Sequence, residues 1–157
     1  MFHLSNKSKS LGLLVFWGLL IEAAIPTAPQ LNSISVWAHQ VEVSEDVAAT
    51  FHLEPNHNPR AGQPARVWFA LTRRGGKIIP LEQCNCKLAV YPKERQEGDK
   101  PLMQPPLKAI SAEKYQGIPG ADIVFPKAGI YQLDLSGTAK KPANFQPFKL
   151  SYTVSVR

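Results

Sequence analysis

Strict alternation of apolar and polar residues is the feature that most constrains the fold of this chain. In the last ten residues every second position is apolar: Phe148, Leu150, Tyr152, Val154 and Val156. Successive side chains of a β-strand point to opposite faces, so this pattern predicts a strand with one buried face. Shorter alternations occur at 49–53 and 65–72, with Pro and Gly between them and no sustained helical period.

These alternations predict an all-β domain spanning residues 39–157. Seven to nine strands with a turn signal about every ten residues favour an immunoglobulin-like β-sandwich over a barrel. The glycines of RRGGK (73–77) predict a tight hairpin turn into a strand at 77–81. The charged, Pro-rich stretch 92–106 predicts a long exposed loop, which we expect Met103 to fasten to the sandwich.

The N-terminal region has the layout of a secretory signal. Lys7 and Lys9 precede an apolar run, Leu11–Ile21, that small residues follow. The run is short for a membrane span. We therefore predict a signal peptide over residues 1–38 and a periplasmic or other exported location.

The end of this signal segment is open on sequence grounds. Cleavage soon after the apolar run, at Ala24 or Ala28, gives the usual length, whereas cleavage after Ala38 leaves His39 as the mature N-terminus. The third alternative is an uncleaved anchor that holds the domain on a membrane, although Glu22 makes a longer spanning segment costly.

Both cysteines of the chain lie in QCNCK, one residue apart. Strand alternation places Cys84 and Cys86 on the same face as Leu88 and Val90, which is the apolar face. In an extended strand the Cα atoms of such a pair are about 6.6 Å apart, near the limit for a disulfide, unless the strand bends. Core packing or a strained disulfide, a soft-metal site, and a redox couple all remain open.

The second group of candidate ligands is HLEPNHNPR. His52 projects to the face opposite Phe51, and His57 falls in a Pro- and Asn-rich turn, so we expect both imidazoles to be exposed. Imidazole is a common ligand of Cu(II) and Zn(II), and an N-terminal His39 would add an amine and a ring nitrogen. Trp68 is expected on the outward face of its strand, where it would support a partner or a second sheet.

Charge and motifs exclude several classes of function. The formal net charge is +6, but the basic residues are scattered apart from the pairs at 73–74 and 140–141, so we expect no nucleic-acid partner. The sequence has no Gly-rich phosphate loop, nucleophile elbow or H-E-x-x-H motif. We therefore expect a protein that is not an enzyme.

Several motifs resemble a known group of exported domains. The order GQPARVWFALTRRGGKIIP, a cysteine strand, a Pro-rich loop with Met103, and FPKAGIYQLDLSG resembles copper-associated immunoglobulin-like domains of the CopC and YtkA/FixH type, over residues 49–156. The phrases FHLEPNHNPRAG and WFALTRRGGK also resemble an uncharacterised family of exported cyanobacterial proteins. The resemblance implies the sandwich fold and a copper ligand.

In CopC an N-terminal and a later histidine bind Cu(II), which the resemblance carries over to His39 only. No histidine follows His57 in this chain, and the methionine-rich Cu(I) loop is reduced to Met103. Any metal would therefore use a different set, drawn from the candidate ligands His39, His52, His57, Cys84 and Cys86.

The sequence thus predicts a non-enzymatic exported binding or accessory domain with copper as its candidate ligand. The alternative is a structural or assembly factor of a membrane protein complex, which would use Trp68 and the 92–106 loop to contact a membrane protein partner. A thiol redox protein that uses Cys84 and Cys86 is a third class.

Overall fold

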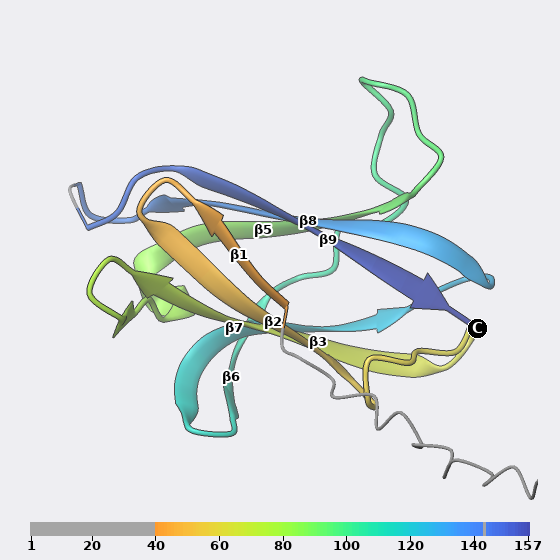
Figure 1. The fold of residues 1–157 in the computed structure, drawn as a ribbon, viewed down its shortest axis with the longest axis horizontal. Coiled ribbons are helices and arrows are strands. Elements are labelled where there is room, and N and C mark those ends of the chain that lie inside the picture. The colour runs from red at the N-terminus through yellow and green to blue at the C-terminus, as the bar shows by residue number, and fades with distance from the viewer. Residues whose placement is uncertain (1–39, 143) are drawn as a thin grey trace, which may run out of the picture. The chain divides into compact units, whose positions relative to one another are not determined.

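The computed structural model describes residues 40–142 and 144–157 of the chain. The predicted signal segment 1–38 and the candidate ligand His39 lie outside the described residues. Within them the domain has nine strands and one short 3-10 turn (Figure 1). In chain order these are β1 (Gln40–Ser44), β2 (Val47–Glu54), β3 (Pro64–Arg73), β4 (Lys77–Ile78), η1 (Leu81–Gln83), β5 (Cys84–Pro92), β6 (Lys108–Ala112), β7 (Tyr115–Val124), β8 (Gly129–Ala139) and β9 (Phe148–Val156).

The strands form two antiparallel sheets that pack face to face as a sandwich. The larger sheet, which we call sheet A, has the order β1-β2-β3-β7-β6, with β4 paired to β3, and the smaller one, sheet B, has the order β5-β8-β9. The neighbours β2-β3-β7-β6 and β5-β8-β9 reproduce the ABED and CFG sheets of constant-type immunoglobulin domains. The predicted all-β, immunoglobulin-like sandwich is therefore confirmed.

A tyrosine at the start of β8 adds a second immunoglobulin feature. The hydroxyl of Tyr131 donates a hydrogen bond of 2.8 Å to the carbonyl oxygen of Lys127, four residues upstream. Immunoglobulin-like domains fasten the corner before the sixth strand of the fold with a tyrosine in this way. The buried ring of Tyr131 also packs on Phe125, which ties β8 to the end of β7.

The core lies between the two sheets and follows the predicted alternation. All five apolar residues of β9 are buried and the residues between them are exposed. Phe51 from sheet A stacks on Tyr152 from sheet B, with ring centroids 4.7 Å apart. Burying a large apolar side chain of this kind stabilises the fold by about 1.5–3 kcal/mol.

The predicted hairpin turn and loop anchor are confirmed, whereas the strand after the hairpin is shorter than predicted. Gly75 and Gly76 adopt positive φ at the β3–β4 turn, as predicted. The following strand ends at Ile78 rather than at 81, because Pro80 has no N–H to donate to a ladder and the turn η1 begins after it. Met103 packs against the core and pairs with Val90, which confirms its predicted role in fastening the 92–106 loop.

A small second cluster lies on the face of sheet A that points away from sheet B. Trp68 and Ala70 of β3 are buried there with Ile118, under side chains from β4, β6 and β7. Trp68 does project outward as predicted, but only 1% of it is exposed. Because the strand β6 was not predicted, its side chains over Trp68 were not foreseen either.

Candidate metal centre

His52 and His57 come together on the outer side of sheet A. The Nε2 atom of His57 lies 3.2 Å from the Nδ1 atom of His52, and the two rings meet edge to face with centroids 4.6 Å apart. Both side chains are half-buried rather than exposed. The two imidazoles share one hydrogen-bonding position, in which one ring donates and the other accepts according to their tautomers.

Trp68 fixes the orientation of His52. The two residues are direct partners across β2 and β3, and their rings stack with centroids 4.7 Å apart and planes 16° from parallel. The indole Nε1–H of Trp68 donates a hydrogen bond of 3.3 Å to Oε1 of Glu54, which projects from the same face of β2 as His52. A stacked ring has few orientations available, so Nδ1 of His52 is held toward His57.

The turn that carries His57 is anchored at both ends. The amide N–H of His57 donates to the carbonyl oxygen of Leu53 at 2.7 Å, and the left-handed φ of Asn56 and His57 brings the chain back toward β2. The C-terminal residue Arg157 completes the anchorage, because its backbone N–H bonds to the carbonyl oxygen of Pro59 and its side chain to Asn58. The His57 ring is therefore positioned before any ligand arrives.

Cys84 and Cys86 are joined to each other in a disulfide, with Cα atoms 5.1 Å apart. This separation is shorter than that of a fully extended strand, so the start of β5 is locally contracted. Cys84 is buried in the core between the sheets and Cys86 packs against it, as the alternation indicated. A disulfide sulfur is not a thiolate, so this pair can ligate a soft metal only after reduction.

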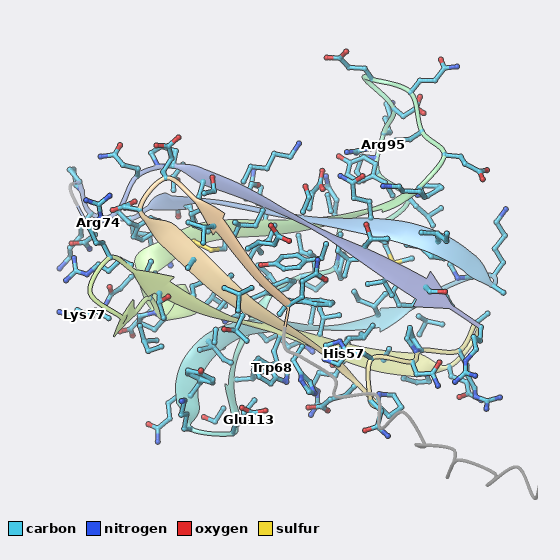
Figure 2. All side chains as sticks on the ribbon, viewed as in Figure 1. His57, Trp68, Arg74, Lys77, Arg95 and Glu113 are labelled. Atoms are coloured by element: carbon cyan, nitrogen blue, oxygen red, sulfur yellow. A yellow bond between two sulfur atoms is a disulfide. The ribbon has the colours of Figure 1, made fainter. Side chains whose placement is uncertain are left out.

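The structure therefore brings His52 and His57 together, but it places them apart from the cysteine pair. The histidines lie beside Trp68, whose position next to His57 is labelled in Figure 2, whereas the cysteines belong to β5, where they pair with β8 and pack on the core. Among residues 40–142 and 144–157, no three His, Cys, Asp or Glu side chains gather as a metal-binding group.

In that same part of the chain, no helix is long and apolar enough to cross a membrane.

The contribution of Trp68 to this site was missed from the sequence, although a signal for it exists. His52 and Trp68 both alternate to the outward faces of their strands. Pairing β2 with β3 so that Phe51 lies opposite Phe69 places the imidazole against the indole, and this is the register observed. Register can be tested from the sequence because a slip of one residue would bury polar side chains.

Comparison with known proteins identifies no family for this chain. No protein-family model matches it, and no curated protein matches it. Among solved structures, the chain is similar to the crystal structure of a DUF4426 family protein from Pseudomonas aeruginosa PAO1, with 12% sequence identity and a TM-score of 0.46. That similarity covers 74% of this chain and 96% of the other.

Proposed function

We propose that this protein is a non-enzymatic binding or accessory domain of the CopC/YtkA/FixH kind, which acts outside the cytoplasm and binds copper through His52 and His57. The observation that carries the proposal is the 3.2 Å separation of His57 Nε2 and His52 Nδ1. Imidazole nitrogens bind metals at about 2.0–2.1 Å, so two of them in neighbouring coordination positions lie roughly 2.9–3.4 Å apart. A metal that replaces the shared proton keeps this N···N separation, with each ring turning so that its lone pair points at the metal.

His39 is the proposed third ligand. Gln40, the next residue, pairs with Phe51, the residue before His52. If the signal is cleaved after Ala38, the free amine and the ring of His39 can both bind Cu(II), and water would complete the coordination.

The disulfide supports the location proposed for the domain. Disulfides persist in the periplasm and other oxidising compartments and are rare in the cytosol. With Cys84 and Cys86 bonded to each other, the proposed site uses nitrogen ligands, which suit Cu(II). A Cu(I) site at the cysteines remains a prediction for the reduced protein.

Equilibrium dialysis against Cu(II) tests the proposal. We expect His52→Gln and His57→Gln each to weaken Cu(II) binding by at least about tenfold, because each removes a ligand from a multidentate site. Gln63→Ala, a neutral change at an exposed position beyond this turn, is the control and should bind as the wild type does. Binding that persists at full strength in a His52→Gln/His57→Gln protein would contradict the proposal.

The part played by His39 is tested by the N-terminus itself. Protein that starts at His39 should bind Cu(II) more tightly than protein with two extra residues, Gly-Ser, before His39, because the extension removes the amine ligand. Equal affinities would exclude the N-terminal amine while leaving the His52 and His57 pair to be judged by its own variants.

The second candidate function is a structural or assembly factor for a membrane protein complex. Leu102 and Ile130 are 46% and 51% exposed, and they line a hollow of about 500 Å³ between the 92–106 loop and the β7–β8 turn. Trp68 does not favour this function directly, since it is covered. Site-directed cross-linking from position 102 in membranes tests this candidate. We expect a specific adduct with a membrane protein, which Ile130→Lys abolishes and Ile130→Val preserves. The absence of such an adduct would argue against this candidate.

A further inference from the structure

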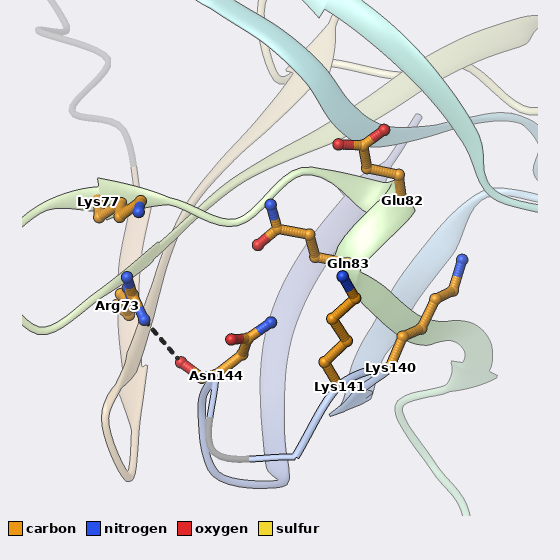
Figure 3. Close-up of a pocket in the computed structure, with 7 residues that line it drawn as sticks. All are labelled: Arg73, Lys77, Glu82, Gln83, Lys140, Lys141 and Asn144. Carbon is orange, nitrogen blue, oxygen red and sulfur yellow. Dashed lines mark hydrogen bonds between the residues drawn. The ribbon is translucent and has the colours of Figure 1, made fainter.

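A basic cleft opens at the end of the sandwich where β3 turns into β4 (Figure 3). Lys77 marks this end in Figure 2, and the C-terminus lies at the opposite end of the same view in Figure 1. Its volume is about 580 Å³, within the usual range for small-molecule sites. Four cations, one carboxylate and two amides line it: Arg73, Lys77, Lys140, Lys141, Glu82, Gln83 and Asn144.

The cleft assembles two basic pairs that are far apart in the sequence. Arg73 ends β3 and Lys77 begins β4, so they come from one wall, whereas Lys140 and Lys141 follow β8 and form the other. The turn η1 lies between these walls and contributes Gln83. Each pair alone would be an ordinary solvated group, but their convergence concentrates positive potential in a concave surface.

Hydrogen bonds hold the two walls together. The guanidinium Nη1 of Arg73 donates to the carbonyl oxygen of Asn144 at 3.1 Å, which links β3 to the β8–β9 connection. The backbone N–H of Lys140 donates to the carbonyl oxygen of Gln83 at 3.0 Å, next to the disulfide at Cys84. The backbone of the cleft is therefore built from fastened elements rather than from a free loop.

The cations of the cleft are not neutralised within the described part of the chain. The ion pairs there involve Arg66, Arg95 and Lys149. Lys77, Lys140 and Lys141 are exposed, and neither they nor Arg73 lies within ion-pair distance of a carboxylate among residues 40–142 and 144–157. Four positive groups against Glu82 leave an excess charge that a single carboxylate ligand would not balance.

We propose that this cleft binds a multiply charged anion through its phosphoryl groups. A phosphoryl group offers three oxygens and up to two negative charges, which ammonium groups from several directions and one guanidinium can contact together. This site is separate from the histidine pair and is independent of copper. The same chemistry occurs in soluble phosphorylated molecules and in lipid headgroups that carry a phosphomonoester.

Calorimetric titration with pyrophosphate tests the cleft in the folded domain. Lys140→Gln/Lys141→Gln should weaken pyrophosphate binding by at least about tenfold at low salt, since two charge-assisted contacts are lost. Lys100→Gln/Lys127→Gln removes the same charge from exposed positions outside the cleft and should change the affinity by less than about twofold. An equal loss in the two double variants, or no saturable binding by the wild type, would overturn the proposal.

Glu82→Gln gives a change of opposite sign. Removing the one carboxylate of the cleft should tighten pyrophosphate binding by roughly threefold, as expected for a partly solvated charge. Damage to the fold would weaken binding rather than tighten it. A gain in Glu82→Gln therefore shows that the loss in the lysine variants reflects charge and not misfolding. Weaker binding by Glu82→Gln would contradict the proposal.

Vesicle sedimentation then distinguishes the two sources of the phosphoryl group. Phosphatidic acid in phosphatidylcholine vesicles presents a phosphomonoester, while phosphatidylcholine alone presents none. Binding to the former that pyrophosphate displaces and Lys140→Gln/Lys141→Gln abolishes would support the cleft and assign a lipid headgroup. Pyrophosphate binding without vesicle binding would support the cleft and assign a soluble ligand.

Discussion

The histidine pair and the cysteine pair both carry ligand atoms that metals select, nitrogen in one and sulfur in the other, yet the fold gives them different environments. Nδ1 of His52 and Nε2 of His57 face each other on the outer side of sheet A, in half-buried side chains. The sulfurs of Cys84 and Cys86 are bonded to each other and pack in the core. Strand register and turn geometry, rather than residue type, decide which pair is open to a ligand.

The largest expected effect comes from removing the support of the histidine pair. Trp68→Ala deletes a buried indole and should lower the free energy of unfolding by about 3–5 kcal/mol, measured by urea denaturation. It should also weaken Cu(II) binding, because His52 loses the ring on which it stacks. Trp68→Phe keeps a stacking surface and is the control: copper binding that falls equally in both variants would show that stacking does not orient His52.

The packing of the cysteine pair can be disrupted through Gly137, which lies opposite Cys86. A Cβ atom at position 137 would lie 2.6 Å from Cζ of Phe148 and 2.7 Å from Sγ of Cys84. Gly137→Ala should therefore destabilise the domain by about 1–3 kcal/mol, as expected for an overpacked core. Copper affinity should stay unchanged, and Thr138→Ala, at the exposed neighbouring position, should have little effect on either quantity.

Removing the disulfide separates the roles of the two pairs further. Cys84→Ser/Cys86→Ser should lower the free energy of unfolding by about 1–2 kcal/mol, since the closed loop is very short. We expect Cu(II) affinity of the oxidised wild type and of this variant to agree within about twofold, because neither sulfur belongs to the proposed nitrogen site. A loss of Cu(II) binding in the variant would instead place the cysteines in the site.

A smaller effect is expected from acid, through the buried carboxylate of Asp134 in the sheet that also holds the cysteine pair. Burial raises the pKa of Asp134, but hydrogen bonds from Ser151, Gln132 and Arg95 and the charge of Lys149 outweigh it, so the pKa lies below its usual value. A lowered pKa in the folded protein means that ionised Asp134 stabilises above the unfolded value of about 3.9, and that this contribution is lost as the pH falls through the folded value.

Asp134→Asn should therefore cost about 1 kcal/mol at pH 7 in urea denaturation, and the difference from the wild type should vanish in strong acid. Asp134 lies on β8, in sheet B, so Cu(II) affinity at pH 7 should not change. Ser136→Ala on the same strand is the control. A stability difference between Asp134→Asn and the wild type that grows as the pH falls would contradict the expected sign.

Alternation predicted most of the sandwich because it reports burial directly. It placed the apolar residues of β9, the face of the cysteines and the outward direction of Trp68 correctly. It missed β6 because Lys108–Ala112 is mostly exposed and carries little apolar contrast. Because β6 was not predicted, the burial of Trp68 under its side chains was not predicted either.

The candidate sites were less predictable because they depend on contacts between distant segments. Alternation assigned His52 to a face and turn residues placed His57 in a loop, but their approach depends on left-handed backbone at Asn56 and His57 and on the anchorage by Arg157. In the same way, the basic pairs at 73–74 and 140–141 were visible as separate pairs. The fold brings Arg73 of the first pair together with Lys140 and Lys141 in one cleft, which Lys77 also lines.

Copper binding by the histidine pair can be observed by pulsed electron paramagnetic resonance of Cu(II) bound to protein that starts at His39, since this method counts the imidazoles that bind the metal. We expect at least two coordinated imidazoles in the wild type, with the loss of one in His52→Gln and of one in His57→Gln. The same imidazole count in the wild type and in His52→Gln/His57→Gln protein would show that copper does not bind at this pair.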